Sequence, residues 1–360
     1  MIPQHKPTFD NEERQALIEY LQQEPEPYYT EFKKTKQLEE MIASYTKSRY
    51  CIMMPNGTLS LSCALLAFGV KPGDEVICPA LTMAATATSV QLIGATPVFC
   101  DIKGLTMDPE DLERKITDKT KAVIYVSLNN HYDNIVEIKN ICNRYSIDLL
   151  EDAAQSLGCW NSENHVGTHG RIGSFSFSTP KIISTGQGGA LITDDSELNH
   201  KIRLIKNFGR PSSGTSDHYI TFGVNLKITD LQAVIGIEQM KKLPQRVERM
   251  KHIHARYYSH LKDIMMEKPY DGYIPWFVCI YVDNRQMLID HLKENGIQTR
   301  CIYPVLPNQP AFDDLSNERF PEATVRSLTG LWLPSFITIT DEQIDFICNT
   351  IKEFNLKIDL

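Results

Sequence analysis

Between residues 75 and 154 the chain alternates short apolar stretches with stretches of helical spacing. The apolar stretches are continuous, which is the pattern of strands that are buried on both faces of a sheet. Such strands, each followed by a helix, predict an α/β fold with a mostly parallel sheet between layers of helices. The expected strands are "EVICPA" (75–80), "TPVFCDI" (96–102), "KAVIYVSL" (121–128) and "IDLLEDAA" (147–154), and the expected helices span 82–94, 108–117 and 134–146.

The last third of the chain follows a different pattern. A long charged helical stretch contains Pro244 and reaches about Lys262, and short apolar segments and a closing helix over 340–354 follow it. No flexible linker separates the two patterns, and 360 residues are more than one compact domain usually needs. We therefore expect a large α/β domain over 1–245, which includes an N-terminal helical segment, packed against a smaller α+β domain over 246–360.

Charge and composition narrow the range of functions. The formal net charge of -8 argues against general binding to nucleic acid or to an anionic membrane, although a local basic pocket for a phosphorylated ligand is compatible with it. No apolar run is long enough to span a bilayer, and the opening "MIPQHKPTFDNEERQ" has the features of neither a signal peptide nor a transit peptide. The nine cysteines form no CxxC pair, so we expect reduced core thiols in a cytoplasmic protein and no metal site.

A single lysine, Lys181, lies in the run "SFSFSTPKIISTGQGGALITDD" (174–195), between two expected strands. Serines, threonines and glycines around it let a flat ligand approach the backbone closely. A lysine that is fixed in position and has a lowered pKa is a nucleophile for carbonyl groups. Taken alone, a solvated lysine in a hairpin loop is the more common arrangement.

The strand "IDLLEDAA" ends in acidic residues, and Gln155 follows shortly after it. Ligands of open α/β sheets bind at the carboxyl ends of the strands. There Asp152 can hold a protonated pyridine nitrogen, which keeps a cofactor ring electron-poor, and Gln155 can donate a hydrogen bond to a phenolic oxygen. Alternatively, Asp152 caps the segment that follows.

Two further stretches are candidates for a phosphate site. Asn56, Gly57 and Thr58 precede an apolar helix, whose N-terminal N–H groups and dipole favour an anion. In "FGVNLKITDLQAVIG" (222–236), Asn225 and Lys227 are polar candidates ahead of a second helix. Ordinary helix capping explains either stretch when it is considered alone. No GxxxxGK[ST] loop is present and no GxGxxG follows a strand. The sequence therefore lacks the motifs that usually indicate nucleotide hydrolysis or dinucleotide binding.

Considered together, these residues indicate one cofactor. Pyridoxal 5′-phosphate (PLP) carries an aldehyde, a pyridine nitrogen, a phenolic oxygen and a phosphate on a single ring. The sequence offers a lysine, an acid, a glutamine and a helix N-terminus, which match these four groups.

The sequence resembles the DegT/DnrJ/EryC1/StrS family of sugar aminotransferases, which have the fold type I of PLP-dependent enzymes. The resemblance covers nearly the whole chain. It is carried by "NGTLSL", "GVKPGDEVICPALTMAATATSVQLIGATPVFCDI", "EDAAQSLG", "FSFSTPKIISTGQGGALITDD", "NLKITDLQAVIG" and "LWLPSFITITDEQIDFI". It implies a mixed, mostly parallel sheet of the seven-stranded type and a smaller C-terminal α+β domain.

The resemblance also implies roles for individual residues. Lys181 would form the imine with the cofactor and then move the proton, Asp152 would bind the pyridine nitrogen, and Gln155 would contact the phenolic oxygen. The phosphate would be held by Gly57, Thr58 and Ser176. Asn225 matches a residue that reaches the phosphate in the neighbouring subunit, which implies a homodimer with shared active sites. Met83 stands where the family usually has an aromatic residue stacked on the cofactor.

The reaction implied is the transfer of an amino group from L-glutamate to a ketosugar attached to a nucleoside diphosphate. The layout resembles most the members that convert a 4-keto-6-deoxy hexose into a 4-amino-4,6-dideoxy sugar such as perosamine or viosamine. A 3-aminotransferase acting on a 3-keto sugar nucleotide, and a non-catalytic regulator that retains the fold, are the alternatives. Dehydrating members carry histidine in place of the lysine, so Lys181 argues against that reaction. Departures from the family pattern, such as "VSLNNHYDN" (126–134), fall on the substrate side.

Overall fold

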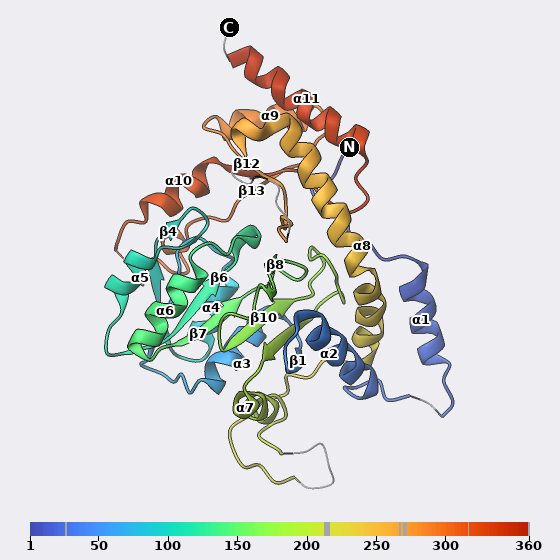
Figure 1. Ribbon diagram of the computed structural model, residues 1–360, viewed down its shortest axis with the longest axis vertical. Helices are drawn as coiled ribbons and strands as arrows, with labels where there is room; N and C mark the ends of the chain where they lie inside the picture. The colour runs from blue at the N-terminus through green and yellow to red at the C-terminus, as the bar shows by residue number, and fades with distance from the viewer. Residues whose placement is uncertain (26, 212–216, 266–267, 269–271, 316, 359–360) are drawn as a thin grey trace.

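The computed structural model describes residues 1–25, 27–211, 217–265, 268, 272–315 and 317–358. Its main feature is a seven-stranded sheet in the order β1-β11-β10-β7-β6-β2-β3 (Figure 1). Strand β11 runs antiparallel to both of its neighbours and the other six strands run parallel, so the sheet is mixed and mostly parallel, as predicted. These strands are β1 (Tyr50–Met54), β2 (Glu75–Pro79), β3 (Thr96–Cys100), β6 (Thr120–Val126), β7 (Asp148–Asp152), β10 (Ile172–Ser176) and β11 (Gly189–Thr193).

Helices cover both faces of this sheet, which explains why its strands are continuously apolar. In β1, Ile52 and Met54 join one core together with residues of α3, while Cys51 and Met53 join a second core together with residues of α2 and α8. A third core lies between the strands and helices α5 and α6. The helices are α1 (Asn11–Leu21), α2 (Lys33–Thr46), α3 (Gly57–Ala67), α4 (Ala85–Leu92), α5 (Pro109–Lys115), α6 (Ile135–Tyr145), α7 (Ser196–Lys206), α8 (Asp230–Leu261), α9 (Arg285–Glu294), α10 (Pro321–Thr329) and α11 (Asp341–Ile358).

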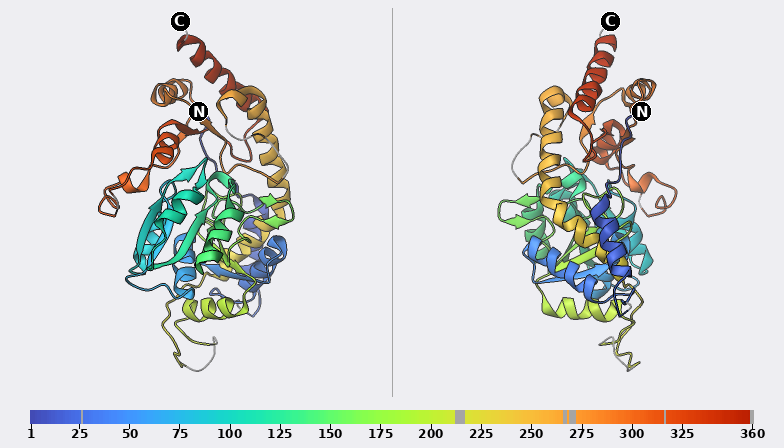
Figure 2. Two further views of the ribbon diagram at one scale, coloured as in Figure 1. Left: turned by 60° about the vertical axis from the view of Figure 1, so that its left-hand side comes forward. Right: turned by 90° about the vertical axis from the view of Figure 1, so that its right-hand side faces the viewer.

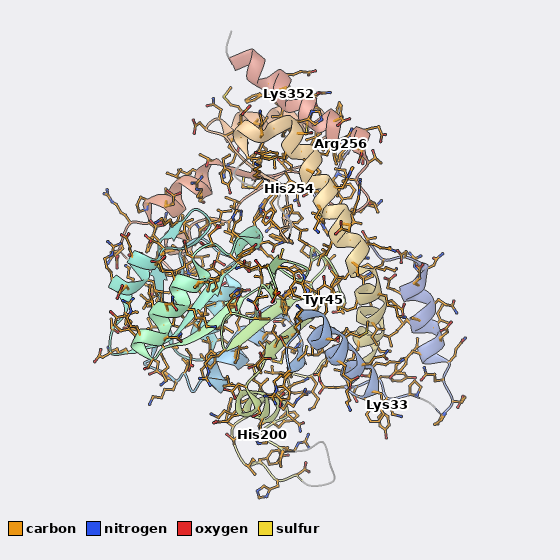
Figure 3. All side chains as sticks on the ribbon, viewed as in Figure 1. Lys33, Tyr45, His200, His254, Arg256 and Lys352 are labelled. Carbon is orange, nitrogen blue, oxygen red and sulfur yellow. The ribbon has the colours of Figure 1, made fainter. Side chains whose placement is uncertain are left out.

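Helix α8 connects the large sheet with the C-terminal part of the chain (Figures 1 and 2). It begins with a capping box, in which Thr229 accepts from the backbone of Gln232, and it continues through Pro244. It therefore runs without a break past residue 245, and the division at 245/246 stays a prediction. Near its end, Arg256 lies beside α11, where its Nε donates to Asp345 at 2.8 Å (Figure 3).

The C-terminal part is built on a small antiparallel sheet in the order β12-β14-β13, with α9, α10 and α11 around it. The apolar core on the α3 side of the large sheet continues into this part through Trp276, Tyr303 and Trp332. The two parts therefore share buried surface. The remaining short elements are β4 (Ile102–Lys103), β5 (Thr106–Met107), β8 (Trp160–Asn161), β9 (Asn164–His165), β12 (Cys279–Tyr281), β13 (Arg300–Cys301), β14 (Gly330–Trp332), η1 (Leu128–Asn130), η2 (Lys262–Ile264) and η3 (Leu306–Asn308).

The structure also bears on two sequence predictions, the reduced core cysteines and the lack of a membrane-spanning run. Eight of the nine cysteines are buried free thiols, as predicted for core residues, and Cys301 is exposed. Within the described ranges, no helix combines the length and the apolar character needed to cross a membrane.

Candidate active site

A cavity of about 340 Å³ lies at the carboxyl ends of the central strands, within the size range of small-molecule sites. Strands β1, β7 and β10 end at it, and the helix α3 begins at it. Of the eight residues that the family resemblance assigns to the cofactor, seven line this cavity: Gly57, Thr58, Met83, Asp152, Gln155, Ser176 and Lys181. The structure therefore brings together residues that are spread over 125 positions of the sequence (57 to 181).

Lys181 lies in the turn after β10, where its backbone N–H donates to the carbonyl of Ser178 at 3.0 Å. Burial lowers the pKa of its ammonium to about 8, because leaving water disfavours the charged form. The negative charge of Asp152 raises this pKa and the positive charge of Arg300 lowers it further, both as smaller effects. The ammonium lies over the ring of Trp276, 4.4 Å from the centroid.

We expect the proton of Lys181 in the cofactor-free protein to be lost near pH 8, against about 10.4 for an exposed lysine. Acylation over a pH series, read residue by residue by peptide mass spectrometry, measures this midpoint, with the exposed lysines of the same chain as an internal reference. Because the folded chain releases this proton at lower pH than the unfolded chain, its contribution to the free energy of unfolding increases as the pH rises from 8 toward about 10.4. A midpoint equal to that of the exposed lysines would show that burial does not act on Lys181.

Asp152 is the last residue of β7 and only 7% exposed. Its carboxylate accepts hydrogen bonds from Oγ1 of Thr86 at 3.0 Å and from the backbone N–H of Ala154 at 3.2 Å. Burial raises the pKa of this carboxyl group, while these hydrogen bonds and the charge of Lys181 lower it. A buried carboxylate without a close cationic partner is costly. A protonated ring nitrogen of a bound cofactor would supply that partner.

The start of α3 forms the opposite end of the cavity. Oδ1 of Asn56 caps the helix by accepting from the backbone N–H of Leu59 at 2.9 Å. A Cβ on Gly57 would lie 3.2 Å from the Cβ of Ser176, so glycine allows the helix to approach β10 this closely. The helix N-terminus and the hydroxyl groups of Thr58 and Ser176 provide the donors that a phosphate needs.

Gln155 has a fixed orientation. Its Oε1 accepts from the backbone N–H of Asn129 at 2.6 Å, which settles the assignment of the amide oxygen. The NH₂ group is therefore the donor in the hydrogen bond between the Gln155 side chain and the phenol of Tyr303, and both residues line the cavity. Met83 also lines the cavity and is 49% exposed, so a flexible thioether stands where a stacked aromatic ring is usual in the family.

Asn225 does not line this cavity. It is exposed, its Oδ1 accepts from the backbone N–H of Lys227 at 3.3 Å, and it forms an isolated bridge with Asn207. Asn225 therefore lies outside the cavity of its own chain, and its predicted role in a neighbouring subunit stays a prediction.

Three lining residues of the C-terminal part were not predicted: Trp276, Arg300 and Tyr303. Nε1 of Trp276 donates to the carbonyl of Pro180 at 2.7 Å, next to Lys181. The guanidinium of Arg300 lies over the rings of Tyr303 and Trp332, and no carboxylate among the described residues pairs with it. Burial raises the pKa of the Tyr303 phenol, against a smaller lowering by Arg300. An arginine three residues before a tyrosine in "RCIYP" was the available signal, but it needs a known fold to be interpreted.

The residues present fit PLP at each of its four groups, as the lysine, the buried carboxylate, the oriented amide and the helix N-terminus all face one cavity. Together with the seven-stranded mixed sheet, this fit defines the class of protein, a PLP-dependent transferase of fold type I. The chain belongs to the DegT/DnrJ/EryC1/StrS aminotransferase family, whose model matches residues 7–352. It is a PLP-dependent sugar-nucleotide aminotransferase.

Curated relatives give a more detailed picture. A GDP-perosamine synthase of Escherichia coli O157:H7 is 30% identical, with 98% of each chain covered. A protein of Geobacillus stearothermophilus named "Pleiotropic regulatory protein" is 35% identical over 89% of this chain and 88% of the relative. A UDP-2-acetamido-2-deoxy-3-oxo-D-glucuronate aminotransferase of Pseudomonas aeruginosa is 34% identical over 87% of this chain and 88% of the relative.

Solved structures support the fold and the cofactor. The putative sugar aminotransferase Spr1654 of Streptococcus pneumoniae in its PMP form superposes with a TM-score of 0.92 at 25% identity, covering 98% of this chain and 97% of that chain. Its PLP form superposes with a TM-score of 0.91 at the same identity, with 98% of each chain covered. The predicted fold class, enzyme class and cofactor are confirmed.

Proposed function

We propose that the protein transfers an amino group from L-glutamate to C4 of a 4-keto-6-deoxy hexose carried on a nucleoside diphosphate. The product would be a 4-amino-4,6-dideoxy sugar nucleotide of the perosamine or viosamine type. The observation that supports this choice is the similarity to GDP-perosamine synthase along 98% of both chains. A C3 aminotransferase is the second candidate, and it is favoured by the relative of P. aeruginosa whose name specifies a 3-oxo sugar.

We further propose the following roles for the residues of the cavity. When bound, PLP supplies an electron-poor ring that makes the neighbouring carbon of the amino donor acidic. Lys181, with its lowered pKa, is the group that holds the cofactor and moves the proton between substrate and cofactor. Asp152 keeps a negative charge against the ring nitrogen. Gln155 donates to the phenolic oxygen, and Gly57, Thr58 and Ser176 bind the phosphate.

The homodimer is also a proposal. Residues 207–211 and 217–225 extend away from the large sheet below α7 (Figures 1 and 2). The exposed large apolar residues of this segment are Phe208, Tyr219, Ile220, Phe222 and Val224. Such a concentration of exposed apolar side chains marks an interaction surface. We propose that a second copy of the chain covers this surface, which would make the protein a homodimer.

We expect Phe222→Asp to shift the protein from a dimer toward the 41.0 kDa monomer, because it places a charge in the apolar segment at a residue that is 67% exposed. Leu328→Asp is the matched control, since Leu328 is 62% exposed on α10, away from this segment. Light scattering on the eluting peak measures the mass. Equal masses for the two variants would argue against this surface as the dimer contact.

The substrate is tested with purified protein, L-glutamate, and 4-keto-6-deoxy and 3-keto sugar nucleotides in parallel reactions. Mass spectrometry detects the aminated product, and NMR locates the amino group on the ring. Amination at C4 supports the proposal. Turnover of the 3-keto substrates alone would replace it with the second candidate.

A further inference from the structure

The turn after β6 contains two consecutive buried asparagines with unusual backbone angles. Asn129 has φ 50° and Asn130 has φ 69°, and the two side chains are 0% and 1% exposed. Residues other than glycine rarely adopt the left-handed region, and asparagine tolerates it better than most. Non-glycine residues held in this conformation occur often at functional sites.

Asn129 forms hydrogen bonds to both sides of the active-site cavity. Its backbone N–H donates to Oε1 of Gln155 at 2.6 Å. Its side-chain Oδ1 accepts from the backbone N–H of Phe277 at 3.0 Å, and its carbonyl accepts from the hydroxyl of Tyr273 at 3.3 Å. One residue therefore joins the end of the large sheet to the segment of the C-terminal part that carries Trp276.

The segment 274–277 is held at both ends by this turn. Nδ2 of Asn130 donates to the carbonyl of Ile274 at 2.5 Å, and Asn129 holds Phe277. Trp276 lies between these two anchors. Its Nε1 donates to Pro180 at 2.7 Å and its ring lies 4.4 Å from the Lys181 ammonium. The turn thus holds the backbone on both sides of Trp276, and the ring itself also packs edge-on against Trp332.

Only the oxygen of the Asn129 side-chain amide forms a hydrogen bond among the described residues. Its Nδ2 is buried and has no hydrogen-bond partner among the described residues, which is costly in an interior. A residue selected only for packing would avoid this cost. The acceptor Oδ1 and the left-handed backbone are the two properties of Asn129 that the contacts require.

We propose that Asn129 is a positioning residue, which orients Gln155 toward the cofactor and holds Trp276 over Lys181. The proposal rests on the proposed function for the roles of Gln155 and Lys181. The residue itself does not line the cavity. It acts through the two residues that it holds.

The test uses Asn129→Gly, because glycine keeps the left-handed backbone and the bond to Gln155 while removing Oδ1. Asn134→Gly is the matched control, since Asn134 also has a left-handed φ of 45° in the same loop. Its Nδ2 donates to Oγ1 of Thr106 at 3.5 Å, whereas the two anchors of segment 274–277 are Asn129 and Asn130. The readout is the acylation rate of Lys181 over a pH series in the cofactor-free full-length chain, with thermal melting as the check on folding.

We expect Asn129→Gly to raise the pH midpoint of Lys181 by about one unit, because release of Trp276 admits water to the ammonium. At pH 8 this shift lowers the acylation rate about fivefold. Asp152 and Arg300 are the charges that act on Lys181, and neither is altered by the substitution. Asn134→Gly should leave the midpoint unchanged. In the background of Trp276→Leu, Asn129→Gly should add little, since its effect is transmitted through that ring.

A midpoint for Asn129→Gly equal to that of Asn134→Gly, at similar melting temperatures, would overturn the proposal. If Asn129→Gly does not fold, Asn130→Gly releases the other end of segment 274–277, and absence of a shift there would overturn it equally. The assay needs no sugar substrate. Failure of the proposed function, seen as a lack of amination, is therefore distinguishable from failure of this inference.

Discussion

Replacing Lys181 with alanine is expected to lower turnover by at least about 10⁴-fold, the upper range for the loss of one acid–base group alone. The substitution removes the amine that we assign both to holding PLP and to moving the proton. No other lysine lines the cavity among the described residues, so no nearby amine can replace it. Steady-state kinetics of the loaded variant measures the loss, and cofactor affinity is expected to decrease as well.

The control for this variant is Lys201→Ala, because Lys201 is an exposed residue of α7 that pairs with Glu197 at 2.8 Å. Such a surface ion pair contributes little to stability, so this variant should behave like the original protein. Turnover by Lys181→Ala at the rate of the control would show that the assigned lysine has no role in the reaction.

The second large effect is expected for Asp152→Asn. Asparagine has almost the same shape. Its Oδ1 can accept from the backbone N–H of Ala154 while its NH₂ group donates to the hydroxyl of Thr86, which can also accept, so the fold should be retained. The substitution removes the negative charge of Asp152, which we propose stabilises the protonated ring nitrogen of the cofactor. We expect turnover to fall about 10²- to 10³-fold, the scale for removing one preorganised electrostatic group.

Asp148→Asn is the matched control, because Asp148 begins the same strand β7 and pairs with Arg171 at 2.6 Å at a more exposed position. Kinetics and melting temperature are measured for both variants. If Asp152→Asn retains full turnover, its carboxylate is a cap for the following segment and the assignment to the cofactor is wrong.

The strand order of the large sheet was not predicted, but its class and the position of its functional edge were. Local pattern carries that information, because the apolar run of each of the strands β6 and β7, and the acid that ends β7, can be read from a few neighbouring residues. The motif around Lys181 is local too, and resemblance to the family then added Ser176 and Met83. A site at the carboxyl edge of a parallel sheet follows from topology alone.

The residues that sequence reasoning missed act through distant contacts. Trp276, Arg300 and Tyr303 reach the cavity only because the small sheet packs against the large one. Asn129 makes its contacts because its backbone is left-handed, and the sequence "LNNH" does not predict that conformation. Asn225 was expected in a site of another subunit, and that position stays a prediction.

We propose that this protein carries amino groups from L-glutamate to a sugar nucleotide through PLP held at Lys181. The most direct measurement is the near-visible absorption of the purified, PLP-loaded protein before and after L-glutamate, and again after the 4-keto sugar nucleotide. We predict a yellow band that glutamate removes and that the sugar nucleotide restores as its amine forms. A PLP-loaded protein whose band is unchanged by L-glutamate would contradict the account.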